Sequence, residues 1–350
     1  MRFDRTGICG VAAFALLAGC SGNVASPSTS PLSATGAASW RGDAIGAPAI
    51  RRSDGALHGL PAPQAAKDGI YVSEFYATNV FGYPKKNVKK RKPSCTVPWT
   101  SSDVNDVAVD GTGALIVPDP GDAAIDIGTG PGMCGPESQS IPEGYGYPSD
   151  AASDNAATGT IVVGNFRDNP SFEYPGSVTV CTVAAGCTSN LTNSNILGVV
   201  GVALDKHGNC WASSESQSAA AVLVYFAKCS GGGVVATGFQ DTAFGGLDID
   251  RSENLVSIDG TANGTGQVWV YKGCNPACKL VGGPFPLNGE STYGHLNAKG
   301  NRFAVADIAY GQVDIYSYSP TAVKYLYSFS KGLRASYEVQ SVVYNPSSMK

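Results

Sequence analysis

Short runs of alternating apolar and polar residues recur along most of this chain. The clearest copy reads GGLDIDRSENLVSIDGTANGTGQVWVYK and covers residues 245–272. Its alternation predicts strands at Leu247–Ile249, Leu255–Ile258 and Gln267–Tyr271, with turn residues between them. Because the copy holds no apolar run of helical length and period, we expect it to be built from strands alone.

The same pattern returns in four further full copies. They start at Asp106, Asp150, Gly201 and Gly294. The chain ends on a lone first strand, Gln340–Asn345, whereas Gly69–Pro84 supplies a second and a third strand with no first strand before them. The copies therefore number six if these two ends share one sheet. Such pairing would close a ring through backbone hydrogen bonds and remove open sheet edges.

These repeats predict an all-β fold, a six-bladed β-propeller whose last blade is closed by N- and C-terminal strands. Each blade would have four strands, the outermost being the weakest. The consensus, apolar-A-V-D-x-x-G-x-L-x-V-x-D followed by x-V-x-V-Y, resembles NHL-type repeats and the related SMP-30/gluconolactonase-like propellers. The resemblance extends from Gly69 to the C-terminus. It implies a fold more than a function, because propellers host many activities.

The residues before the repeats have a different composition. Residues 1–19 carry two Arg and an apolar run, Ile8–Ala18, that is too short to span a membrane, so they predict a signal peptide. The run ends in Leu17-Ala18-Gly19-Cys20, which resembles the bacterial lipobox. This resemblance implies that Cys20 becomes the lipidated first residue of the mature protein. An ordinary secretory signal is the alternative.

A linker follows the predicted lipidated cysteine. Residues 20–68 are rich in Ser, Ala, Pro and Gly, which predicts a disordered, flexible tether before the propeller of residues 69–350. Ser21 resembles the residue that directs lipoproteins to the outer membrane. We therefore expect a monomer anchored to the outer membrane of a bacterial cell envelope, on either its periplasmic or its surface side.

The composition indicates many turns, and the net charge bears on the partners of the protein. The chain has 44 Gly, which suits many tight turns. Its formal net charge of −4 gives no reason to expect nucleic-acid binding.

Ten Cys predict an oxidising compartment, and two of them lie in the leader. Hairpin positions suggest disulfides within the other eight, in the pairs Cys181–Cys187, Cys274–Cys278, Cys210–Cys229 and, as the remaining pair, Cys95–Cys134. Zinc bound through Cys274 and Cys278 is the alternative.

Two polar rings are expected at one mouth of the propeller. The first strand of each blade lines the centre, and the loop after the second strand opens on the face where the first strand begins. The strand-start ring offers Asp106 and Asp150, with His295 beside it. The second-strand-end ring offers Glu74, Asp119, Asn165, Asp259 and Asp307.

These rings allow two interpretations. One is a divalent-cation site, with Ca²⁺ as the expected ion, because Ca²⁺ accepts many oxygen ligands in flexible geometry. The resemblance to lactonase-type propellers implies that such a metal would polarise a carbonyl while a carboxylate moved the proton. The other is structural, since Asp and Asn at strand ends accept hydrogen bonds from the next turn. Repetition in most blades favours the structural interpretation, and Asp106 and Asp150 are the less repetitive candidates.

Two insertions interrupt the repeat, at residues 130–147 and 166–175. Long loops on a rigid scaffold are common sites of recognition. The candidate rim residues for a protein or glycan partner are Phe166, Arg167, Phe172, Tyr174, Tyr145 and Tyr147. The alternative is that these loops fold over their own blades. Lys85–Lys92, KKNVKKRK, is the strongest charge run, and we expect it on the opposite face, either solvated or bound to an anionic glycan, lipopolysaccharide or membrane surface.

The sequence as a whole predicts a lipid-anchored cell-envelope propeller that acts as a ligand- or protein-binding scaffold module. The alternative is a metal-dependent, lactonase-like hydrolase or lyase at the acidic mouth. Gly201, Gly246 and Gly294 weaken that alternative, because they leave half of the strand-start ring without side chains. The chain also lacks the motifs of α/β-hydrolases, zinc proteases and P-loop proteins.

Overall fold

The structure is a computed structural model. It describes residues 69–74, 79–98, 104–128, 137–154, 159–168, 174–215, 221–241, 245–260, 265–291, 293–333 and 339–345. All of them belong to the compact unit of residues 46–350. The signal peptide, the lipobox and the tether predicted for residues 1–68 lie outside the described residues. The described part contains no helix that is both long and apolar enough to cross a membrane.

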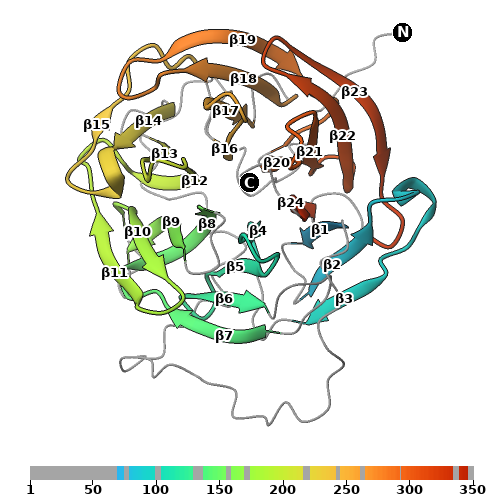
Figure 1. The fold of residues 1–350 in the computed structure, drawn as a ribbon, viewed down its shortest axis with the longest axis horizontal. Helices are drawn as coiled ribbons and strands as arrows, with labels where there is room; N and C mark the ends of the chain where they lie inside the picture. Colours follow the sequence, from blue (N-terminus) through green and yellow to red (C-terminus); the bar gives the residue numbers. More distant parts are fainter. Residues whose placement is uncertain are drawn as a thin grey trace, which may run out of the picture. The chain divides into compact units, whose positions relative to one another are not determined.

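Six four-stranded antiparallel sheets form a ring in the described residues (Figure 1). From the centre outward, the first blade has β4 (Ala108–Val109), β5 (Leu115–Asp119), β6 (Ala124–Gly128) and β7 (Glu137–Pro142). The second has β8 (Gly146–Ser153), β9 (Thr160–Asp168), β10 (Ser177–Thr182) and β11 (Gly186–Leu191). The third has β12 (Gly198–Leu204), β13 (Cys210–Glu215), β14 (Ala221–Phe226) and β15 (Val234–Val235).

The remaining three blades repeat this arrangement. The fourth has β16 (Leu247–Ile249), β17 (Asn254–Asp259), β18 (Gln267–Lys272) and β19 (Lys279–Pro286). The fifth has β20 (Gly294–Leu296), β21 (Arg302–Asp307), β22 (Gln312–Ser319) and β23 (Ala322–Phe329). The closing blade has β24 (Val339–Asn345), β1 (Gly69–Glu74), β2 (Asn79–Pro84) and β3 (Cys95–Pro98).

The closing blade joins the two ends of the propeller. Strand β24 pairs with β1 in antiparallel register, with Gly69 opposite Asn345 and Val72 opposite Val342. The predicted six-bladed propeller, closed by N- and C-terminal strands, is therefore confirmed. Because all six sheets lie within residues 69–345, this segment contains a complete ring with its own core.

The apolar core lies between neighbouring blades. Leu247 and Leu255 of the fourth blade pack in one buried cluster with Ala203 and Trp211 of the third. Full burial of a side chain as large as Leu contributes roughly 1.5–3 kcal/mol. Since each blade packs against two others, the ring holds the innermost strands in fixed register at the centre.

The strand predictions are accurate in the fourth blade and wrong in part of the second. Strand β16 has the predicted bounds, and β17 and β18 are longer by only one or two residues. By contrast, residues 166–168 continue β9 and do not open a loop. They pair with the start of β8, where Tyr147 lies opposite Arg167. The region before β8, expected to be an insertion, includes the outer strand β7.

Three predicted disulfides are confirmed, namely Cys181–Cys187, Cys210–Cys229 and Cys274–Cys278. The bond between Cys274 and Cys278 removes the zinc alternative at these residues. Cys95 is disulfide-bonded as well. Its predicted partner, Cys134, lies outside the described residues.

Candidate functional site

The strongest candidates from the strand-start ring meet at the centre of the propeller. Asp106 precedes β4, Asp150 lies in β8 and His295 lies in β20, so three blades contribute to one cluster. Asp106 is fully buried and Asp150 is 2% exposed. The His295 side chain keeps 14% of its surface exposed.

Asp106 is the hub of this cluster. Its Oδ1 accepts a hydrogen bond from the Ser341 hydroxyl of β24 and lies 3.5 Å from His295 Nε2. Its Oδ2 accepts a hydrogen bond from the Ala151 backbone N–H at 3.5 Å. The carboxyl of Asp150 is a further hydrogen-bonding partner of Asp106. One carboxylate thus joins the closing, first, second and fifth blades.

Two other carboxyls connect neighbouring blades in the same way. Asp150 Oδ2 accepts a hydrogen bond from the Val202 N–H of β12 at 2.5 Å. Asp248 Oδ2, in β16, accepts one from the Leu296 N–H of β20 at 2.7 Å and lies 3.8 Å from His295 Nδ1. Each carboxyl therefore accepts a backbone hydrogen bond from the innermost strand of the following blade. This recurrence indicates a structural role at the centre of the ring.

Contacts within the cluster lower the pKa of Asp106 and raise those of Asp150 and His295. Although burial on its own would raise the pKa of Asp106, hydrogen bonds from Asp150, His295 and Ser341 hold it below its ordinary value. Burial, together with the charge of Asp106, raises the pKa of Asp150 well above its ordinary value. The pKa of His295 is raised because Asp106 outweighs the opposing effect of burial. The surroundings therefore favour the charged form of Asp106, the neutral form of Asp150 and the charged form of His295.

This arrangement can hold or move a proton between Asp106, Asp150 and His295, which is the elementary requirement of general acid–base chemistry. The same hydrogen bonds, however, occupy the oxygens that a cation would need. Among the described residues, no group of three or more His, Cys, Asp or Glu side chains is placed to hold a metal ion. The Ca²⁺ site therefore stays a prediction of the sequence.

The second-strand-end ring is dispersed among the individual blades. Asp119 Oδ1 accepts a hydrogen bond from the Asp122 N–H at 3.0 Å, and Asp307 Oδ1 accepts one from the Tyr310 N–H at 3.2 Å. Both bonds span three residues within the turn that follows the strand. The two other acidic members, Glu74 and Asp259, are fully buried. The hydrogen bonds of Asp119 and Asp307 support the structural interpretation of this ring.

Three buried carboxyls that sequence reasoning missed lie near this ring. Burial and the charge of Asp119 raise the pKa of Asp126 to about 8. Burial raises the pKa of Asp241 to about 7 and, with the charge of Asp307, that of Asp314 to about 6. A sequence signal existed for two of them, because Asp126 and Asp314 each lie seven residues after the ring carboxylate they face.

The rim candidates form a second cluster, at the edge of the second blade. Arg167 is 9% exposed, and its guanidinium carbon lies 4.8 Å from the centre of the Tyr174 ring and 5.8 Å from that of Phe166. The two rings meet edge to face, with centres 5.7 Å apart. Tyr174 leaves 37% of its surface exposed. The predicted rim residue Phe172 lies outside the described residues.

In the structure, the segment before β8 lies beside the end of β9, although the two are separate in the sequence. Glu143 Oε2 accepts hydrogen bonds from the N–H groups of Tyr145 and Gly146, at 2.5 and 3.0 Å. Its Oε1 accepts one from Asn165 Nδ2 at 3.1 Å. Through these bonds and the pairing of Tyr147 with Arg167, the start of β8 lies beside the end of β9. Tyr145 is 38% exposed, so two partly exposed tyrosines belong to one corner of the blade.

The glycines of the strand-start ring allow neighbouring backbones to approach closely. A Cβ atom on Gly201 would lie 2.2 Å from the carbonyl oxygen of Gly245, and one on Gly294 would lie 2.5 Å from that of Ala304. The space beside these glycines is thus filled by the protein itself.

Comparison with known proteins shows the fold of this chain but gives neither its family nor its function. No family model and no curated protein matches the chain. A crystal structure of a functionally unknown protein from Desulfotomaculum acetoxidans is similar, with a TM-score of 0.51 and 13% identity over 76% of this chain and 81% of that chain. The chain is a six-bladed β-propeller whose resemblance to NHL-type and SMP-30-like propellers no family match confirms.

Proposed function

We propose that this protein is a lipid-anchored cell-envelope propeller that binds a ligand through the rim cluster of Phe166, Arg167, Tyr174, Tyr145 and Tyr147. The observation that carries the proposal is the convergence of the segment before β8 and the end of β9 on one corner of the second blade. A rigid scaffold that presents exposed tyrosines from two segments is a common basis for recognition.

The chemistry of the rim cluster favours an acidic glycan. Tyr174 and Tyr145 offer partly exposed rings, which can cover the apolar face of a sugar. Arg167 supplies a positive charge beneath Tyr174. Because this guanidinium is largely buried beside two aromatic rings, we propose that it orients Tyr174 and attracts a carboxylate.

The experiment is a binding titration with soluble peptidoglycan fragments, which carry sugar rings next to carboxylates. A neutral chitin oligosaccharide is the matched ligand without the acid. We expect Tyr174→Ala to weaken binding of the acidic fragments at least about tenfold. Tyr325→Ala is the control, because Tyr325 is 46% exposed on the outer strand β23. Equal binding by both variants would contradict the role of the rim, and preference for the neutral sugar would contradict the role of Arg167.

One observation favours a second candidate, a hydrolase or lyase acting at the central mouth. Asp106 and Asp150 have pKa values shifted in opposite directions, and such pairs occur in acid–base catalysis. The matched test is lactone hydrolysis with and without added divalent cations. Cation-dependent turnover that is lost in His295→Gln and kept in Tyr174→Ala would replace the binding proposal with this one.

A further inference from the structure

The surface charge of the propeller differs from its net charge. Among the residues that the structure describes, fifteen exposed residues are Lys or Arg, whereas only Asp122 and Glu253 are exposed acids. The other acidic side chains of the described residues are buried or half-buried, as in the central cluster. The described surface is therefore mainly cationic, although the whole chain has a formal net charge of −4.

The predicted basic run forms one end of a larger cationic surface. Residues 85–92 connect β2 to β3 and include the 3-10 turn η2 (Val88–Lys90), whose Val88 is buried. The Lys89 ammonium lies 4.7 Å from the centre of the Tyr327 ring of β23. Lys331 follows β23, and its Nζ donates a hydrogen bond to the Lys90 carbonyl oxygen at 3.3 Å. These contacts bind the basic hairpin to the fifth blade.

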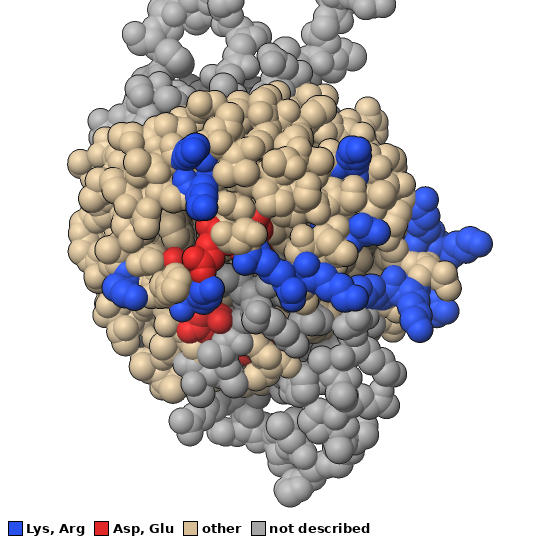
Figure 2. Space-filling view, turned by 45° about the horizontal axis from the view of Figure 1, so that its top comes forward, with Lys and Arg blue, Asp and Glu red and all other residues tan. Residues whose placement is uncertain are grey.

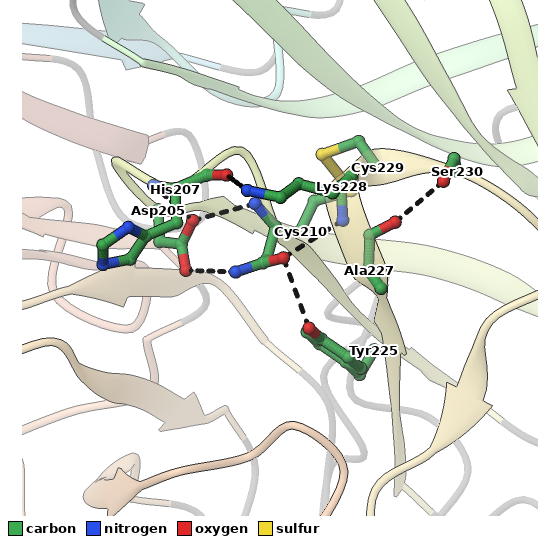
Figure 3. Close-up of a disulfide and its surroundings, with 9 residues drawn as sticks. Asp205, His207, Cys210, Tyr225, Ala227, Lys228, Cys229 and Ser230 are labelled. Atoms are coloured by element: carbon green, nitrogen blue, oxygen red, sulfur yellow. Dashed lines mark hydrogen bonds between the residues drawn. A yellow bond between two sulfur atoms is a disulfide. The ribbon is translucent and has the colours of Figure 1, made fainter.

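The other end lies on the turns that join first and second strands. In the third blade, Lys206 forms an ion pair with Glu253 of the fourth blade, and Lys228 donates to the His207 carbonyl at 2.5 Å (Figure 3). In the fourth blade, Arg251 Cγ lies 3.3 Å from the Cβ position of Gly300, the residue after Lys299 in the fifth blade. The turns of three consecutive blades thus place their cations side by side.

Arg302 connects these two ends. It begins β21, directly after the turn that carries Lys299. Its charge also acts on the hydroxyl of Tyr327, whose ring faces Lys89. We call the resulting row the basic arc, comprising Lys206, Arg251, Lys299, Arg302, Lys89 and Lys90. All six are exposed. Figure 2 shows Lys and Arg side chains in a row across the molecule, with Asp and Glu side chains beside one end of the row.

We propose that the basic arc docks the propeller onto the anionic phospholipid headgroups of the membrane that holds the lipid anchor. The point where the chain enters the propeller supports this partner. Gly69, the first residue of β1, pairs with Asn345 and with Pro84, the residue before the basic hairpin. The segment leading from Cys20 therefore joins the propeller at the end of the closing blade from which the basic hairpin extends.

The extent of the basic arc also supports this partner. A row of cations across four blades suits an extended anionic plane, and its one exposed acid, Glu253, is paired with Lys206. Docking through the basic arc involves no rim residue, so it goes beyond the proposed function.

The test uses residues 21–350, which contain the complete propeller and lack the anchor. Binding is measured by co-sedimentation with vesicles of phosphatidylethanolamine containing about 30% phosphatidylglycerol, and with phosphatidylcholine vesicles as the neutral comparison. We expect binding to the anionic vesicles alone, weakening as salt rises because screening shortens to about 3 Å at 1 M. Arg251→Gln with Lys299→Gln should weaken binding roughly twenty-five-fold, at about fivefold for each charge.

A charge-preserving pair of substitutions provides the control. Arg251→Lys with Lys299→Arg changes the same two exposed positions and keeps both positive charges. This pair should weaken binding less than about threefold. An equal loss from both pairs, or binding that ignores lipid charge, would overturn the proposal. Binding to heparin without binding to anionic vesicles would also overturn it and assign the basic arc to a soluble polyanion.

Discussion

Replacing Asp106 by Asn tests whether the central cluster stabilises the ring. The change keeps the shape of the side chain and removes the charge that the Ser341 hydroxyl, His295 and Asp150 surround. Removing one partner of a buried charge pair costs about 3–5 kcal/mol. Because Asn keeps one acceptor oxygen, we expect the low end, about 3 kcal/mol. For a propeller of this size, that loss lowers the Tm by about 6 °C.

The pH dependence makes the test specific. The pKa of His295 is raised above 6.5, so its contribution is complete below that pH and is lost as pH rises through the folded value. The pKa of Asp106 is lowered below 3.8, so its contribution is present above that pH and is lost as pH falls through the folded value. The raised pKa of Asp150 acts in the same direction as that of His295. The difference in stability between wild type and Asp106→Asn should therefore be largest between the two ordinary values.

The assay is urea unfolding across this pH range. Asp122→Asn is the control, because Asp122 is an exposed carboxylate, and it should change stability by less than about 0.5 kcal/mol. A loss below about 1 kcal/mol for Asp106→Asn, or a difference that grows as pH rises from neutrality, would refute this account of the cluster.

The remaining predictions concern a disulfide, a close backbone contact and the predicted cation site. Replacing Cys210 and Cys229 by Ala opens a loop with a sequence separation of 19 and should cost about 3 kcal/mol in chemical unfolding; a neutral result would remove this disulfide from the stabilising contacts. Gly201→Ala places a Cβ against the Gly245 carbonyl and should lower stability by about 1–3 kcal/mol, whereas Gly232→Ala, with no atom closer than 4.0 Å, should be nearly neutral. Added Ca²⁺ should leave the Tm unchanged after chelation, because donors already occupy Asp106, and a saturable rise would restore the cation site.

The sequence predicted the ring because its local signals repeat. Strand β16 has its predicted bounds because the LDI run is enclosed by turn residues on both sides. The closure of the ring followed from counting incomplete repeats at the two ends. Such regularities depend on neighbours in the chain, which a sequence displays directly.

The sites were harder to predict because they depend on contacts between distant residues. Ser341 lies 235 residues from Asp106, and no local pattern marks it as a donor. The sequence did not predict the pairing of Tyr147 with Arg167, because the paired ends of β8 and β9 had been interpreted as two loop insertions. The basic arc was only partly visible, since Arg251 and Lys299 are isolated cations in sequence. Their common surface follows from the packing of consecutive blades.

We propose that a lipid on Cys20 and the basic arc together hold this propeller against a membrane. The most direct measurement is fractionation of the full chain, expressed in a Gram-negative host, into membrane and soluble periplasmic pools before and after a high-salt wash. We expect the wild type to remain with the membrane at high salt. Cys20→Ser should associate at low salt through the basic arc and leave when salt screens it. Retention of Cys20→Ser at high salt, or a wild type that fractionates with the soluble pool, would contradict the account.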